Sequence, residues 1–160
     1  MAGHWWDPLA HTDEKETLHG WLQGMRHEVV STLEGLSEEH VRWSPVPSGT
    51  SLGGIVKHLI VVEHNWFQVV LNNQERHRIP GDQEWRLADD ETADDAISRY
   101  QDEASRSDQV ISGTSLEATA ANPAVDRSLR WILVHMVEET ARHAGHADII
   151  RELIDGRTST

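Results

Sequence analysis

Four polar side chains near the C-terminal end of the chain share one narrow face of a predicted helix. With Glu139 as the origin, His143 falls at about +40°, His146 at about −20° and His135 at about −40°. Met136 lies on the same side, so this face is predicted to look inward. An inward glutamate is costly unless it is paired or bound to a metal ion. The cluster therefore indicates a candidate metal site.

Distance along the helix axis limits which of these groups can share one ion. At about 1.5 Å per residue, His135 lies about 12 Å from His143, and Glu139 about 10.5 Å from His146. Neither pair can bind the same ion from a straight helix. The preferred pairs are Glu139 with His143 and His143 with His146, and His135 with Glu139 is a weaker alternative. His143 belongs to both preferred pairs.

A third ligand must come from a facing helix, and His58 is the candidate. It lies in an apolar stripe with Ile55 and Val62, whereas His64 lies on the opposite, polar side. Taken alone, a histidine of this kind is more often an ordinary core residue. Two imidazoles and one carboxylate leave coordination positions open for water or a thiolate, and the ion acts as a Lewis acid. Zn²⁺, Ni²⁺ and Fe²⁺ all suit this ligand set.

No other catalytic motif competes with this site. The chain has no phosphate-binding glycine-rich loop, no His-Glu-x-x-His and no Gly-x-Ser-x-Gly. It also has no cysteine, so a bound metal must be held by imidazole and carboxylate.

Four long helices are predicted to position these residues, in an all-α four-helix bundle with one or two longer crossover connections. Apolar residues recur at spacings of three and four in each of them. Thr12 or Asp13 can cap the first helix and Thr50 or Ser51 the second, while Gly156 suits the end of the fourth. The predicted ranges are 13–36, 51–72, 92–111 and 128–154.

Composition favours one domain over residues 1–160. The net charge of −13 argues against a nucleic-acid partner. No apolar run approaches the roughly 20 residues of a membrane span, and the N-terminus does not look like a signal peptide, so we expect a cytoplasmic protein without a membrane partner. The acidic stretch 82–95 is interpreted as a solvated loop and helix start. Gly53-Gly54 is interpreted as close helix packing or a loosened first turn.

Residues 128–148 resemble the last helix of a DinB-like subfamily, and residues 50–59 resemble its second-helix signature. Trp43-Ser44-Pro45 and the segment 155–158 are similar as well, so the resemblance covers most of the chain. It implies a four-helix bundle that binds a metal ion through three side chains. Many members use His-x-x-x-His for the last two ligands. Glu139-x-x-x-His143 is similar instead to mycothiol-dependent maleylpyruvate isomerases, which implies the ligands His58, Glu139 and His143.

The resemblance implies a metal-dependent thiol S-transferase that uses mycothiol or another low-molecular-weight thiol and a small electrophilic substrate. We expect Zn²⁺, with Ni²⁺ or Fe²⁺ as alternatives. His146 or His135 would move a proton, and Arg142 would contact a carboxylate, unless it is a surface residue beside Glu138. The alternatives are a mycothiol-dependent isomerase, a non-catalytic metal-binding or stress-response protein, and a purely structural polar face. Superfamily members often pair, which leaves a homodimer open.

Overall fold

Each long helix begins at a side chain that caps its first turn. In the computed structural model, which describes residues 5–75, 81 and 83–158, the caps are Asp13, Ser51, Thr92 and Ser128. Each accepts a hydrogen bond from the backbone N–H three residues later, which satisfies a donor that the helix leaves open. The predicted helix starts are thereby confirmed.

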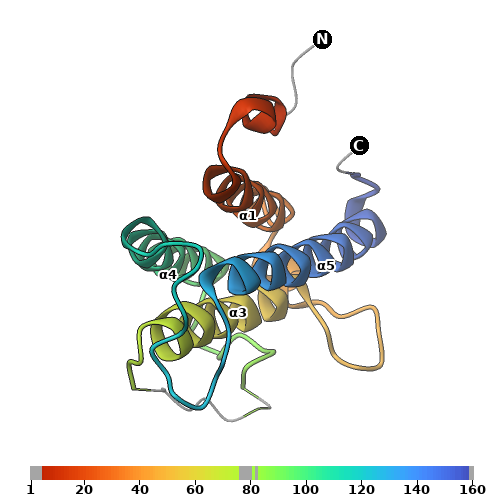
Figure 1. Ribbon diagram of the computed structural model, residues 1–160. Coiled ribbons are helices and arrows are strands. Elements are labelled where there is room, and N and C mark those ends of the chain that lie inside the picture. Colours follow the sequence, from red (N-terminus) through yellow and green to blue (C-terminus); the bar gives the residue numbers. More distant parts are fainter. Residues whose placement is uncertain (1–4, 76–80, 82, 159–160) are drawn as a thin grey trace.

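The helices form the predicted all-α bundle (Figure 1). Helix α5 packs against α1 and α3, and α4 packs against α3. No β-strand forms in the part of the chain that the structure describes. The elements are η1 (Asp7–His11), α1 (Glu14–Ser31), α2 (Glu38–Arg42), α3 (Leu52–Glu63), η2 (His64–Leu71), α4 (Ala93–Gly113) and α5 (Leu129–Asp155).

Two helices differ from the prediction. Helix α1 ends at Ser31 and not near residue 36, because Arg151 of α5 donates to the carbonyl oxygens of Thr32 and Glu34 at 2.8 Å each and holds them in a turn. The second predicted helix is continuous in space, but it changes from α to π geometry at His64. The wider π turns bury Phe67 and Leu71 and leave Val69 only partly buried.

The core consists of two apolar clusters with a buried polar layer between them. One cluster contains Ile55 and Tyr100, and the other contains Phe67 and Met136. Along α1 and α3, the boundary falls at Arg26 and Glu63, which form a buried ion pair with contacts of 2.6 and 2.8 Å. Arg26 also donates to Asp108 of α4 at 2.7 Å. This layer therefore joins three helices at mid-height.

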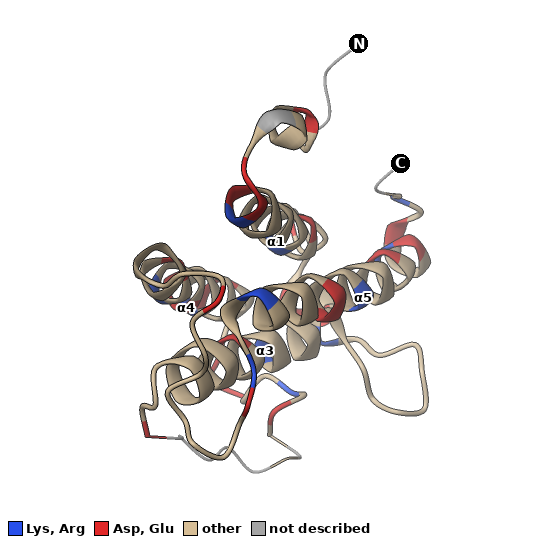
Figure 2. Cartoon of the chain, in the orientation of Figure 1, with Lys and Arg blue, Asp and Glu red and all other residues tan. Residues whose placement is uncertain are grey.

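Positively charged residues are distributed over several elements of the chain (Figure 2). Lys and Arg lie singly on several elements (Figure 2). No helix in residues 5–75, 81 or 83–158 combines the length and the apolar character that a membrane crossing requires.

Candidate metal centre

His58 of α3 meets Glu139 and His143 of α5 in one group. One ligand atom from each side chain lies within 4.8 Å of the other two, and no other such group was found among the described residues. Glu139 Oε1 lies 3.3 Å from His58 Nε2 and 3.2 Å from His143 Nε2. The structure thus brings together the three residues that the sequence analysis selected.

The other two predicted histidines lie outside this group. His146 is exposed, and its ring centre lies 5.5 Å from that of His143. His135 packs against the rings of Trp66 and Trp131, with ring centres 4.7 and 5.3 Å from its own. Helix α5 therefore offers Glu139 and His143, one turn apart, as its converging pair.

The environment sets the protonation states that metal binding needs. Burial opposes ionisation of Glu139, but the imidazoles of His58 and His143 outweigh burial and lower the pKa of the carboxyl group. Burial, together with the neighbouring His58, lowers the pKa of His143. At neutral pH the carboxylate is therefore ionised and the His143 imidazole neutral, which are the forms that coordinate a cation.

Glu84 orients one of the two imidazoles. His58 Nδ1 donates to Glu84 Oε1 at 2.7 Å, which turns its Nε2 toward Glu139. A carboxylate behind a metal-binding histidine selects the tautomer and raises ligand basicity. His143 Nδ1, in contrast, is buried without a hydrogen-bond partner among the described residues. The donor set and the orientation of His58 both fit a divalent cation.

A tryptophan from the same loop covers the group. The Trp85 ring stacks on His58 with ring centres 3.8 Å apart, and lies 5.5 Å from His143. Gly54, one turn before His58, permits this approach, because a Cβ there would lie only 2.2 Å from the Trp85 carbonyl oxygen. Gly53-Gly54 was interpreted as either close packing or a loosened first turn. Close packing is the explanation at Gly54, because the glycine leaves room for the Trp85 backbone.

The acidic stretch 82–95 contains the predicted loop and helix start, since α4 begins at Ala93, but two of its acids are not simply solvated. Glu84 contacts His58, and Glu91 is buried with a 2.6 Å contact to Lys57. Burial opposes ionisation of Glu91, but its hydrogen bonds with Lys57 and the Ala88 N–H outweigh burial and lower its pKa. Asp82 lies outside the described residues. Glu84 and Trp85 were missed because loop residues carry no periodic signal, and only the paired glycines indicated a close neighbour.

Arg142 lies at the edge of the site, with its guanidinium directed at acidic neighbours on the same helix. It is exposed, pairs with Glu138 and lies 3.4 Å from Glu139 Oε2. These contacts agree with the surface alternative, and they also place a cation beside the second oxygen of a candidate ligand.

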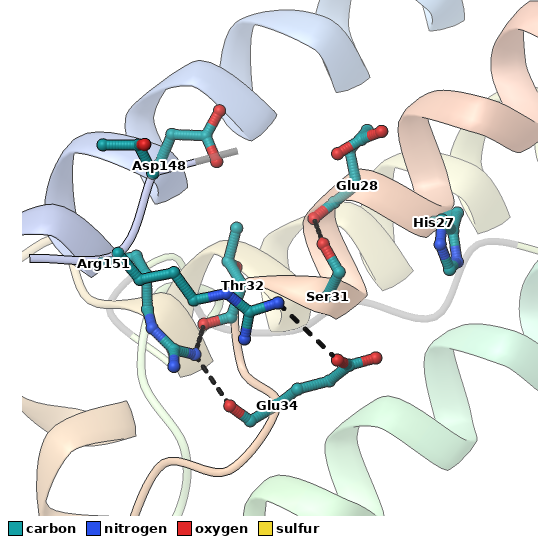
Figure 3. Close-up of a pocket in the computed structure, with 9 residues that line it drawn as sticks. His27, Glu28, Ser31, Thr32, Glu34, Asp148 and Arg151 are labelled. Atoms are coloured by element: carbon teal, nitrogen blue, oxygen red, sulfur yellow. Dashed lines mark hydrogen bonds and ion pairs between the residues drawn. The ribbon is translucent and has the colours of Figure 1, made fainter. Parts of the chain in front are cut away.

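A separate polar pocket lies where α1 and α5 end (Figure 3). Arg151 crosses it to reach Thr32 and Glu34, and its remaining donors bind Asp155 at 2.7 to 3.1 Å. Since these donors already have partners within the chain, Arg151 has a structural role: it holds the ends of α1 and α5 together.

Comparison with known proteins places this geometry in a family. The sequence model of the mycothiol S-transferase family matches residues 17–156, which include His58, Glu139 and His143. The chain belongs to the mycothiol S-transferase family. This family is DinB-like, as the resemblance predicted. No curated protein sequence matches the chain.

A solved structure shows the same fold as this mycothiol S-transferase family member. A conserved protein from Enterococcus faecalis superposes with a TM-score of 0.73, over 91% of this chain and 99% of its own. The two sequences are 12% identical, so the likeness concerns the fold alone.

Proposed function

We propose that this protein is a metal-dependent S-transferase that uses mycothiol, with Zn²⁺ held by His58, Glu139 and His143. The observation that carries the proposal is the convergence of two imidazoles and one carboxylate within 4.8 Å in a chain of this family. Three protein ligands are typical of catalytic zinc sites, because they leave a coordination position for a substrate.

The residues around the site have distinct roles in this proposal. A bound divalent cation would lower the pKa of a coordinated thiol and favour its thiolate. Glu84 keeps His58 Nε2 directed at the site, and the Trp85 ring shields His58 from water. His146 is favoured over His135 as the proton acceptor, because its ring is closer to His143 and is open to solvent.

The transfer itself is a nucleophilic substitution. The sulfur–carbon bond forms while the bond from that carbon to its leaving group breaks, and the leaving group takes the electron pair. The thiol proton passes to His146 and then to solvent. The substrate is thus a small electrophile with a displaceable group; a homodimer and a cytoplasmic location remain predictions.

The test uses untagged protein, mycothiol and monochlorobimane. Metal content is measured by mass spectrometry and the conjugate by fluorescence after chromatography. We expect turnover that chelation abolishes and Zn²⁺ restores. His58→Gln should lose both metal and turnover, whereas His40→Gln, an exposed histidine on α2, should keep both.

The outcomes separate the alternatives. Stoichiometric metal without conjugate above background would overturn the transferase proposal and favour a non-catalytic metal-binding protein. Absence of metal, with no thermal shift on adding Zn²⁺ or Ni²⁺, would overturn both the transferase and the non-catalytic metal-binding protein. It would favour a polar face with a purely structural role.

A further inference from the structure

We infer that an apolar groove beside the candidate metal centre binds the apolar part of the electrophilic substrate. The groove has a volume of about 360 Å³ and lies between the loop 45–50 and the C-terminal half of α5. Val46, Ile149 and Leu153 are among the apolar side chains of its wall. The inference rests on the proposed function, since it names the class of molecule that receives the thiol.

The groove adjoins the candidate metal centre at His146. This histidine lines the groove, and its ring centre lies 5.5 Å from that of His143. Ile149 and Leu153 follow at three and seven residues, so they extend the same side of α5 for about 10.5 Å beyond His146. A substrate with its reactive carbon at the metal centre would therefore place an attached chain or ring along this groove.

The groove exposes apolar side chains that the fold does not bury. Val46 is 42% exposed, Ile149 60% and Leu153 59%. Leu153 lies outside the core, because the buried stripe at this end of α5 runs through Ala147, Ile150 and Arg151. Apolar side chains gathered at an exposed groove mark a binding surface more often than isolated ones do.

The chemistry of the wall selects the occupant. None of the residues that line the groove, all within the described part of the chain, carries a Lys, Arg, Asp or Glu side chain. Its polar side chains are limited to Ser48, Thr50 and His146. Such a wall does not satisfy the many hydroxyl groups of mycothiol, but it suits an alkyl chain or an aromatic ring. The groove is therefore assigned to the electrophile and not to the thiol.

The kinetic test compares iodoacetamide with N-alkyl iodoacetamides of increasing chain length. In each reaction the thiol sulfur bonds to the same methylene carbon, iodide leaves with the bonding electrons and the thiol proton goes to solvent. We expect kcat/KM to rise with chain length, by at most about fourfold for each buried CH₂. Ile149→Ser/Leu153→Ser should remove this rise and leave the rate with unsubstituted iodoacetamide and the Zn²⁺ affinity unchanged.

The matched control is Val134→Ser, which changes an α5 side chain of similar exposure (52%) outside the groove. It should preserve the dependence on chain length. A dependence that survives in the double variant, or that is lost equally in the control, would overturn the inference.

A second measurement is independent of turnover. Binding of unreactive N-octylacetamide is followed by calorimetry, and we expect at least fivefold weaker binding in the double variant but not in Val134→Ser. Selective binding without any conjugation would refute the proposed transferase and leave the groove established as a ligand site. Turnover without such binding would overturn the groove alone. A wild-type dimer that the double variant converts to monomer would show that a second copy covers the groove, which also overturns the inference.

Discussion

Glu84 Oε1 lies 2.7 Å from His58 Nδ1, so a loop residue sets the tautomer of an imidazole on α3. The contact joins positions 26 residues apart in the chain. It directs His58 Nε2 toward Glu139 and His143, and the proposed metal affinity therefore depends on a residue that lies outside the bundle helices.

Replacement of Glu84 by Ala should lower Zn²⁺ affinity by about 10- to 100-fold, as loss of an outer carboxylate partner does at other metal sites. Competition with a chromophoric chelator measures the change. Glu84→Gln keeps an acceptor for His58 Nδ1 and should recover part of the affinity. Asp90→Asn, an exposed acid in the same loop, is the control. Equal affinities for Glu84→Ala and Asp90→Asn would show that Glu84 does not support the site.

Exchange of Glu139 for Gln should weaken Zn²⁺ binding more than loss of Glu84 does, by over about 100-fold, because it removes a charged ligand. His146→Gln should leave the affinity unchanged, since His146 lies outside the group of three. Calorimetry on untagged protein compares the two variants. The reverse ranking would assign the third ligand to His146.

Substitution of Gly54 by Ala should destabilise the protein by about 1–3 kcal/mol, since the new Cβ would overlap the Trp85 carbonyl oxygen. The displaced loop should also weaken Zn²⁺ binding. Gly145→Ala is the control on α5, where a Cβ meets nothing within 4 Å. It should stabilise the protein by up to about 1 kcal/mol through helix propensity. Urea denaturation measures both, and a stabilised Gly54→Ala protein would contradict the packing described here.

Removal of the Glu63 charge by Gln should cost about 3–5 kcal/mol in the free energy of unfolding, because it leaves the buried Arg26 guanidinium without its main partner. The double variant Arg26→Met/Glu63→Leu should recover most of that loss, since an apolar pair needs no charge compensation. Denaturation of the single and double variants measures the coupling. Additive losses would show that the pair does not act as a unit.

Low pH should selectively remove the contribution of Asp108 to the free energy of unfolding. Burial opposes ionisation of Asp108, but hydrogen bonds with His19 and Arg26 outweigh burial and lower its pKa. An aspartate whose pKa is lower in the folded than in the unfolded state stabilises the fold. This stabilisation is complete at pH values above the unfolded-state pKa of about 3.9, and it is lost as the pH falls through the lower pKa of the folded state. The difference in free energy of unfolding between wild type and Asp108→Asn should therefore shrink below about pH 4. Asp94→Asn, an exposed acid on α4, should show no such convergence.

Local interactions explain which predictions succeeded. A cap is recognised within one turn, so Asp13 and Ser51 were among the predicted caps, and the predicted starts at 92 and 128 coincide with the caps Thr92 and Ser128. That Glu139 and His143 lie on the same face of α5 likewise follows from helix geometry alone. The sequence by itself thus determined the all-α fold class and His143 as the candidate ligand shared by the preferred pairs.

Tertiary packing decided the remainder, because contacts between distant segments depend on how the helices and loops meet. It brought His58 to Glu139 and left His146 exposed, a choice that spacing within α5 could not make. It also placed Trp85 over His58 through the space that Gly54 leaves, and ended α1 early through Arg151. A loop side chain has no periodicity that reveals its partner, so the cover of the site became visible only in three dimensions.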